Sequence, residues 1–380
     1  MSHNRVCFIS FLAYPLFDLK TKGEFGGAEL QLYYMATELA RDERFDISFI
    51  TGDFGQADKQ LIERVKLHKL CLPPGVVPLT RIIREYARLW RLMKQIDADI
   101  YVQRAAGLNT GMIALFCRVH RKKFIYMVAH DNDVLRDQTP SWMPRRIIGA
   151  VVWNGFKFGL RNSALVIVQH DRQKENLKRF YCKEGIIRPS AHRLSENSNS
   201  SNKEFILWVA RCEDWKQPDV FLKLAESFPK EKFVMVCPVS KDAEYFERIK
   251  DYALTLPNLQ FVYYVAFNEI EYYFSKAKIF INTSKYEGFP NTFIQAFKNR
   301  APVLSMNVSP GGMFEKYDIG RCTDGNFEQL QIGLENLLKD NQLWQRLSEN
   351  AYEYAESKHN IKKIIEEDKK MILKLLNVDH

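Results

Sequence analysis

The feature of the sequence that most constrains its fold is a regular alternation between short apolar runs and longer amphipathic stretches. The apolar runs in the first half are RVCFISFL, DISFITG, ADIYVQR, KFIYMVAH and ALVIVQH. Runs this short and this apolar are typical of strands buried in a parallel sheet, and the amphipathic stretches between them predict the helices that cover it. The pattern predicts a doubly wound α/β domain over residues 1–190.

A polar segment, PSAHRLSENSNSSNKE at residues 189–204, interrupts the alternation and predicts a linker over residues 191–204. After it the pattern restarts with FILWVAR, KFVMVCPV, LQFVYYVAF, KIFINTS and APVLSMN. We therefore expect a second domain over residues 205–345. Residues 346–380 are charged and helical in pattern, and we expect them to cap the second domain or to pack back on the first.

Two tandem Rossmann-like domains of this kind are expected to face each other across a cleft. In doubly wound sheets, ligands bind beyond the carboxyl ends of the strands. Loops that follow strands in either domain are therefore the places to look for a site.

The charge of the chain is unevenly distributed. The formal net charge is +9, and residues 1–195 carry 31 Lys and Arg against 19 Asp and Glu, which leaves 24 against 27 in the rest. The first domain is thus the part expected to approach an anionic partner: a phosphorylated substrate, an anionic membrane surface or nucleic acid. Solvated basic helices account for much of the excess.

Neither cysteine spacing nor hydropathy indicates a secreted or membrane-spanning protein. The seven cysteines show no paired spacing, which argues against a zinc site or a disulfide framework and favours a reducing, cytosolic setting. The apolar start lacks a small-residue cleavage site and is better interpreted as a first buried strand. No run reaches the roughly 18 apolar residues that a spanning helix requires.

The stretch SKYEGFPNTFIQAF, at residues 284–297, is the segment most indicative of a binding site. It leads from an apolar strand through a Gly and Pro turn into an apolar-periodic helix. The backbone N–H groups from Gly288 to Thr292 are expected to remain free at the start of that helix, where they and the helix dipole attract an anion such as phosphate. Glu287 stands beside them, where an acid can also simply satisfy the dipole.

Five motif-like stretches occur in a fixed order along the chain. The two most specific are FILWVARCEDWKQPDVFLKLAE and EGFPNTFIQAF. The other three are GEFGGAELQ, VAHDND and SPGGMFEK. Together they resemble the motifs of GT-B glycosyltransferases of the retaining family 4 type, and the resemblance extends over nearly the whole chain.

This resemblance implies a nucleotide-sugar site in the second domain. Arg211 and Lys216 would bind the donor diphosphate as a guanidinium fork and a point charge, although their spacing alone is equally typical of a surface ion pair. Glu287 would face the donor sugar as a catalytic residue. The diphosphate would also lie against the helix start formed by Gly288, Phe289, Pro290, Asn291 and Thr292.

Two departures from the family pattern concern the same site. The family usually has glycine before the arginine, where this chain has Ala210. The family's second acid, which resembles a clamp on the nucleotide ribose, is here Gln295. An amide still accepts a hydrogen bond from a hydroxyl but carries no charge, so we expect weaker or altered donor binding.

In the first domain the resemblance singles out a glycine loop and a histidine. Gly26 and Gly27 would let backbone approach a substrate closely, although a Gly pair before a helix is more often only a turn. His130, at the end of a strand, is the second candidate catalytic residue and would contact sugar or phosphate. Its alternative role is that of a structural histidine.

The function expected from these residues is transfer of a hexose from a UDP- or GDP-type donor to a hydroxyl of a cell-surface glycan or lipid-linked acceptor. We expect no metal, because the acid pairs at residues 97–99 and 131–133 are not placed as a metal-dependent architecture needs them. The basic amphipathic stretches at residues 79–96 and 143–161 are typical of core-covering helices, and also of helices that contact a membrane.

Three alternatives to this function remain open. A sugar-nucleotide epimerase of the same fold would release free sugar without an acceptor, and a phosphorylase would need a pyridoxal cofactor. A catalytically silent glycan-binding or nucleic-acid-binding relative is the alternative outside enzymes, and nucleic-acid binding would be steeply salt-dependent. For the enzyme we expect a cytoplasmic location, at the inner face of the cell membrane if the acceptor is lipid-linked.

Overall fold

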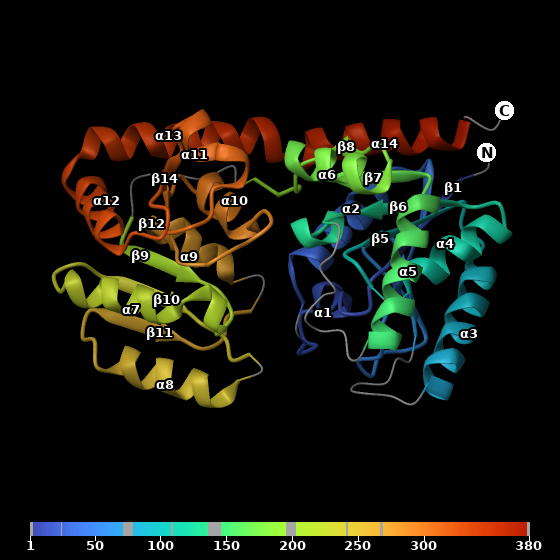
Figure 1. Ribbon diagram of the computed structural model, residues 1–380, viewed down its shortest axis with the longest axis horizontal. Coiled ribbons are helices and arrows are strands. Elements are labelled where there is room, and N and C mark those ends of the chain that lie inside the picture. The colour runs from blue at the N-terminus through green and yellow to red at the C-terminus, as the bar shows by residue number, and fades with distance from the viewer. Residues whose placement is uncertain are drawn as a thin grey trace. The chain divides into compact units, whose positions relative to one another are not determined.

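A computed structural model describes residues 3–23, 25–70, 79–107, 109–135, 146–194, 203–240, 242–266 and 269–377 of the chain. The chain divides into two compact units (Figure 1). Unit 1 comprises Met1–Ala191 and Ile361–His380, and unit 2 comprises His192–Asn360. The chain therefore passes from unit 1 to unit 2 and back again. Most of the predicted linker, residues 195–202, lies outside the described residues.

Unit 1 is built on an eight-stranded sheet in the order β3-β4-β2-β1-β5-β6-β7-β8. All its neighbouring strands are parallel except β3 and β4. The strands are β1 (Asn4–Ile9), β2 (Phe45–Thr51), β3 (Lys59–Ile62), β4 (Val65–Lys69), β5 (Ile100–Arg104), β6 (Lys123–Met127), β7 (Leu165–Val168) and β8 (Ile186–Ile187).

The helices of unit 1 follow the strands as the alternation predicts. They are α1 (Tyr14–Phe17), α2 (Gly27–Leu39), α3 (Leu79–Ile96), α4 (Thr110–Val119), η1 (Asp131–Val134), α5 (Arg146–Asn162), α6 (Asp171–Tyr181) and α14 (Ile361–Asn377). Alternate residues of β1 enter different layers of the core. Cys7 and Ile9 pack in the cluster with α3, α4 and α5. Phe8 instead stacks on Phe49, and Phe49 makes an edge contact with Phe17.

Unit 2 has a six-stranded, wholly parallel sheet in the order β11-β10-β9-β12-β13-β14. Its strands are β9 (Phe205–Val209), β10 (Phe233–Val236), β11 (Leu259–Val262), β12 (Ala277–Asn282), β13 (Val303–Ser305) and β14 (Gly320–Cys322). Its helices are η2 (Asp214–Lys216), α7 (Pro218–Ser227), α8 (Ala243–Leu254), α9 (Ile270–Lys276), α10 (Asn291–Lys298), η3 (Pro310–Gly312), α11 (Met313–Tyr317), α12 (Phe327–Lys339) and α13 (Asn341–His359).

The central strand of unit 2 is apolar throughout because helices cover both faces of the sheet. Ile206 and Trp208 of β9 pack in the core layer with α7, α8 and α12. Leu207 packs in the opposite layer with α9, α10, α11 and α13. Two parallel-sheet α/β domains, as predicted, are thus confirmed.

The two C-terminal helices belong to different units. Helix α13 packs against α10 and α12 in unit 2, and the predicted boundary near residue 345 falls inside it. Helix α14 packs on α2 of unit 1 and buries Ile364, Ile365, Asp368 and Ile372.

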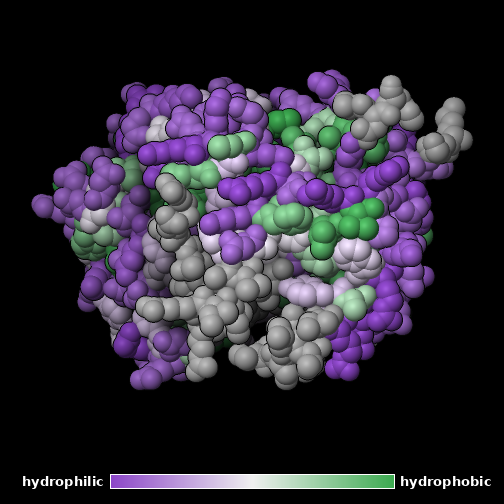
Figure 2. Space-filling model, turned by 45° about the vertical axis from the view of Figure 1, so that its right-hand side comes forward, coloured by the Kyte–Doolittle hydropathy of each residue, from purple (hydrophilic) through white to green (hydrophobic). Residues whose placement is uncertain are grey.

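In the described part of the chain no helix combines the length and the apolar character needed to cross a membrane. The face drawn in Figure 2 is largely hydrophilic, with apolar patches between the hydrophilic side chains. Of the seven cysteines, the six that the structure describes are free thiols, and Cys71 lies outside the described residues.

Candidate active site

The turn from β9 to α7 carries the two basic residues that the sequence predicts for a diphosphate. Arg211 follows the strand and is exposed, with its Nε 3.6 Å from Oε1 of Glu213. Lys216 closes the 3₁₀ turn η2, and its side chain is 13% exposed. The next residue, Gln217, has φ of 50°, a left-handed conformation from which Pro218 starts α7.

The side chain of Lys216 forms an ion pair with Glu287. Its Nζ hydrogen-bonds Oε1 of Glu287, the same oxygen that accepts from Ser284 Oγ at 2.8 Å. The ammonium also lies 4.0 Å from the centre of the Trp215 ring, which stacks on Tyr286. Burial lowers the pKa of Lys216, and the Glu287 carboxylate acts in the opposite direction.

A second acid, Glu213, is fixed in the same turn. Its Oε1 accepts from Ser240 Oγ at 2.8 Å and its Oε2 accepts from Trp215 Nε1. Burial acts to raise the pKa of Glu213, but these hydrogen bonds and the charges of Arg211 and Lys216 lower it overall. Glu213 therefore holds the turn as an anion.

The start of α10 presents the free backbone donors that the sequence predicts. Within the described residues, the N–H groups of Gly288, Phe289, Asn291 and Thr292 donate no hydrogen bond, and the helix has no side-chain cap. Pro290 has no N–H to contribute. The Asn291 side chain is instead held by His192 Nε2, 3.2 Å from its Oδ1.

Gln295 lies one turn further along α10 and is half-buried. No described residue hydrogen-bonds its side-chain amide, although its backbone carbonyl accepts from Asn299. The amide is therefore available to a ligand, and its role toward a ribose stays a prediction.

The charged turn and the end of β12 are joined by one buried threonine. Thr283 Oγ1 lies 2.7 Å from the carbonyl oxygen of Lys216 and accepts a 2.9 Å hydrogen bond from Trp208 Nε1. Lys285 N donates to the Trp215 carbonyl at 2.8 Å. These contacts bring Lys216 and Glu287 together at the carboxyl ends of the neighbouring strands β9 and β12.

In unit 1, Gly26 and Gly27 form the exposed start of α2. They do not follow β1 directly, because the short helix α1 intervenes and buries Tyr14, Leu16 and Phe17. Gly26 N donates to Glu29 Oε2 at 2.8 Å, so this helix start is partly satisfied by its own acid.

His130 lies at the carboxyl end of β6 and caps the 3₁₀ turn that follows. Its Nδ1 accepts from Asn132 N at 3.2 Å, which leaves Nε2 for another partner. Asp133 Oδ2 accepts from the backbone N–H groups of Ala129 and His130 and from Tyr126, and burial raises the pKa of this carboxyl. Asp131 accepts from His170 and Gln173, so both acids of the segment serve the local structure.

The structure thus brings together Glu287, Lys216 and the α10 start in unit 2, and holds Gly26, Gly27 and His130 on loops of unit 1. Sequence reasoning missed Glu213, Trp215, Thr283, Ser284 and His192, whose roles depend on partners far away in the chain. The acid three residues before Lys216 was the only visible signal among them.

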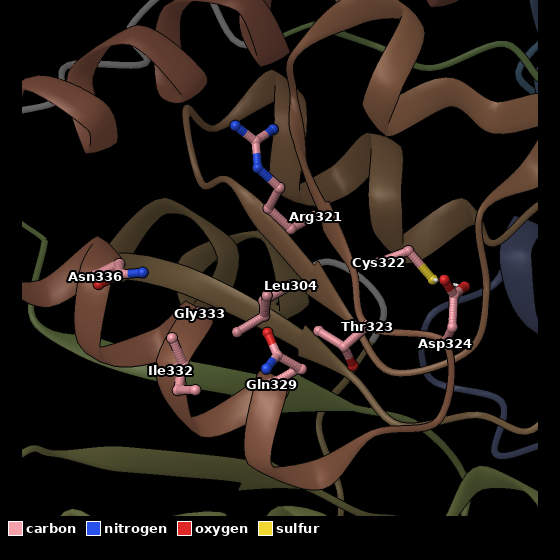
Figure 3. Close-up of a pocket in the computed structure, with 9 residues that line it drawn as sticks. All are labelled: Leu304, Arg321, Cys322, Thr323, Asp324, Gln329, Ile332, Gly333 and Asn336. Atoms are coloured by element: carbon pink, nitrogen blue, oxygen red, sulfur yellow. Dashed lines mark hydrogen bonds between the residues drawn. The ribbon is translucent and has the colours of Figure 1, made fainter.

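A pocket of about 390 Å³ lies elsewhere in unit 2, between β13, β14 and α12 (Figure 3). Its lining includes Arg321, Asp324 and Gln329 and none of the predicted site residues. The described residues contain no group of three His, Cys, Asp or Glu side chains arranged to hold a metal ion.

Comparison with known structures defines the class of protein. Sucrose-phosphate synthase from Thermosynechococcus elongatus superposes with a TM-score of 0.77 at 16% identity, covering 98% of this chain and 99% of that one. Anabaena HepE in complex with UDP-glucose gives 0.70 at 14% identity, covering 98% and 100%. At these identities the likeness concerns the fold, which is that of GT-B glycosyltransferases.

Sequence comparison then gives the family. The model for glycosyl transferases group 1 matches residues 192–354, and that for glycosyltransferase family 4 matches residues 25–188. An uncharacterized glycosyltransferase of Methanocaldococcus jannaschii, MJ1069, is 22% identical over 93% of this chain and 96% of its own length. This chain belongs to the group 1, family 4 glycosyltransferases, and is a glycosyltransferase.

Proposed function

We propose that this glycosyltransferase moves a hexose from a UDP- or GDP-type donor to a hydroxyl of a glycan or lipid-linked acceptor, with retention at the sugar carbon and without a metal ion. The observation that carries the proposal is the contact of Lys216 with Glu287 beside the unpaired N–H groups at the start of α10. The cation and the backbone N–H groups suit the diphosphate of a nucleotide sugar, and the acid suits its sugar.

The chemistry follows from where charge develops. As the bond between the sugar carbon and the diphosphate oxygen breaks, its electron pair goes to the diphosphate. Lys216, Arg211 and the N–H groups of α10 would stabilise that growing charge. Glu287, next to them, would stabilise the positive charge on the sugar while the acceptor hydroxyl forms the new bond and passes its proton to an oxygen of the leaving diphosphate.

Unit 2 would bind the donor and unit 1 the acceptor. HepE, which shares the fold, was crystallised with UDP-glucose, and this supports a UDP donor here. The basic first half of the chain supports an anionic acceptor for unit 1.

The test is thermal unfolding of the full chain with UDP, GDP, ADP, CMP and TDP, each with magnesium and with EDTA. One nucleotide should raise the midpoint equally in both conditions, because only the folded state binds it. No shift with any nucleotide would contradict donor binding, and a shift that needs magnesium would contradict metal independence.

A matched pair of lysine variants makes the test specific. Lys216→Met should abolish most of the nucleotide shift. Lys285→Met should keep it, because Lys285 is an exposed lysine after β12 that pairs with Asp214. Glu287→Gln should bind nucleotide but transfer sugar poorly. Free sugar released from donor alone at an undiminished rate would instead favour the epimerase.

We also propose peripheral contact with an anionic membrane. Arg84, Arg88, Arg91 and Lys94 are all exposed on α3, which is an amphipathic helix. Flotation with anionic but not with neutral vesicles is the expected result, and equal recovery with both would contradict it.

A further inference from the structure

Arg104 is a buried cation that forms no ion pair with any described acid. The residue is 8% exposed, and none of the described carboxylates lies within ion-pair distance of its guanidinium. In the amide orientation that satisfies both ends of Gln169, Nη2 of Arg104 donates to Gln169 Oε1 at 2.9 Å, next to Ser190 Oγ. Both partners are neutral.

The other donors of this guanidinium find no acceptor among the described residues. Nε is sealed from solvent, and neither Nε nor Nη1 makes a hydrogen bond to any described residue. A guanidinium has five N–H donors, and burying them without acceptors is costly. Burial, and then the nearby charge of Arg188, lower the pKa of Arg104 to about 10, which still leaves it protonated at neutral pH.

Arg188, a buried arginine of the same unit, has a structural role and provides a comparison. Arg188 is as deeply buried, but it forms an ion pair with Asp368 of α14. The two acids that act on Arg104 from nearby, Asp133 and Glu29, are occupied by other donors: Asp133 by two backbone N–H groups and Tyr126, and Glu29 by Gly26 N. Among the described residues, Arg104 is thus left without a carboxylate in direct contact.

Arg104 lies at the switch in strand order, which is where doubly wound sheets usually bind ligands. The chain winds from β1 to β2 on one side of the sheet and returns to β5 on the other, so the strand order switches between β1 and β5. Arg104 is the last residue of β5, and Ala105 after it has φ of 71°. The strand lies between β1, which leads to the Gly26 loop, and β6, which ends at His130.

We propose that Arg104 binds an oxyanion of the acceptor, a phosphate or a carboxylate, at this switch point of unit 1. The guanidinium matches such a group in charge and in its paired donor geometry. The assignment to the acceptor rests on the proposed function, which puts the donor in unit 2. The oxyanion would supply the direct anionic partner that the described residues do not provide.

The test measures thermal unfolding of the full chain against inorganic phosphate and, separately, malonate, at ionic strength held constant with sodium chloride. It is run in the Arg211→Met/Lys216→Met background, which removes the proposed diphosphate contacts of unit 2. Phosphate or malonate should raise the midpoint in this background, and whichever acts identifies the kind of oxyanion. Adding Arg104→Met should weaken the apparent affinity about tenfold or more, and Arg104→Lys should restore part of it.

Three results would overturn the proposal. One is no shift with either anion, and another is the same shift after Arg104→Met. The third is a midpoint without anion that falls by several degrees in both Arg104→Met and Arg104→Lys, which would mark a structural residue, since removing an unpaired buried charge should not destabilise the fold.

A separate arm distinguishes this proposal from donor binding. Arg104→Met in the otherwise unchanged chain should keep wild-type affinity for UDP. A loss of UDP affinity would assign the oxyanion to the donor and overturn the acceptor assignment. If wild-type protein binds no nucleotide, the proposed function fails while the phosphate result in the background variant still stands.

Discussion

At the scale of single residues, the charge balance around Lys216 is the feature with most bearing on donor binding. Its ammonium is nearly buried, packed on Trp215 and hydrogen-bonded to Glu287. A buried ammonium loses its proton more easily than an exposed one, because the charged form loses solvation. Donor binding should therefore depend on pH through this residue.

As the pH is raised, we expect UDP affinity to fall at a lower pH than it would if Lys216 had the pKa of an exposed lysine. The protonated ammonium is the form that attracts the diphosphate, and burial lowers the pKa of Lys216, so raising the pH removes the charge early. Arginine stays charged, and Lys216→Arg should hold its affinity to higher pH. Isothermal titration from about pH 7 to about pH 10 measures this, and an identical decline in both proteins would contradict it.

At the scale of secondary structure elements, the site depends on how the β9 turn is attached to the end of β12. Thr283 makes this attachment with one hydroxyl that contacts Trp208, Lys216 and Gln217. Because Thr283 is fully buried, no water can replace these hydrogen bonds.

Thr283→Val should destabilise unit 2 and weaken UDP binding together. Valine has nearly the same shape but leaves Trp208 Nε1 without an acceptor, which costs about 1–3 kcal/mol. Urea unfolding and UDP titration measure the two effects. Thr255→Val, which removes an exposed hydroxyl bonded to the Tyr252 carbonyl, should change neither. Normal UDP affinity in Thr283→Val would show that the turn keeps its geometry without this bond.

At the scale of the whole molecule, the last helix returns the chain to unit 1. Helix α14 brings Asp368 to Arg188, 180 residues earlier in the chain, and Lys369 to Asp42 at 3.2 Å. Its apolar face buries Ile364, Ile365 and Ile372. Unit 1 is therefore complete only when helix α14 is in place.

Ile372→Ala should weaken unit 1 without affecting the donor site of unit 2. The side chain is fully buried, and removing it should cost about 2–4 kcal/mol. Calorimetry should show a lower midpoint, and UDP affinity should stay at the wild-type value. The exposed neighbour in Lys370→Ala serves as control and should be neutral. A loss of UDP affinity in Ile372→Ala alongside the lower midpoint would show that the donor site of unit 2 depends on the stability of unit 1.

Much of the fold was predictable because it depends on local pattern. Strands buried on both faces must be apolar at successive positions, and amphipathic helices must repeat near 3.6 residues, so both leave a signature within about ten residues of sequence. The alternation and its interruption at residues 189–204 therefore predicted two doubly wound domains. The motifs around Arg211 and Glu287 predicted the family.

What the sequence could not determine is which side chains meet. Lys216 and Glu287 are 71 residues apart, and their contact exists because β12 lies next to β9 in the sheet. The same holds for Arg188 with Asp368, and for Arg104, whose hydrogen-bond partners Gln169 and Ser190 are neutral. Pairing between distant residues is set by strand order and by the return of the final helix, and neither leaves a local pattern. The sequence alone determined the two domains and the family, and only the tertiary structure decided which charged side chains pair with one another.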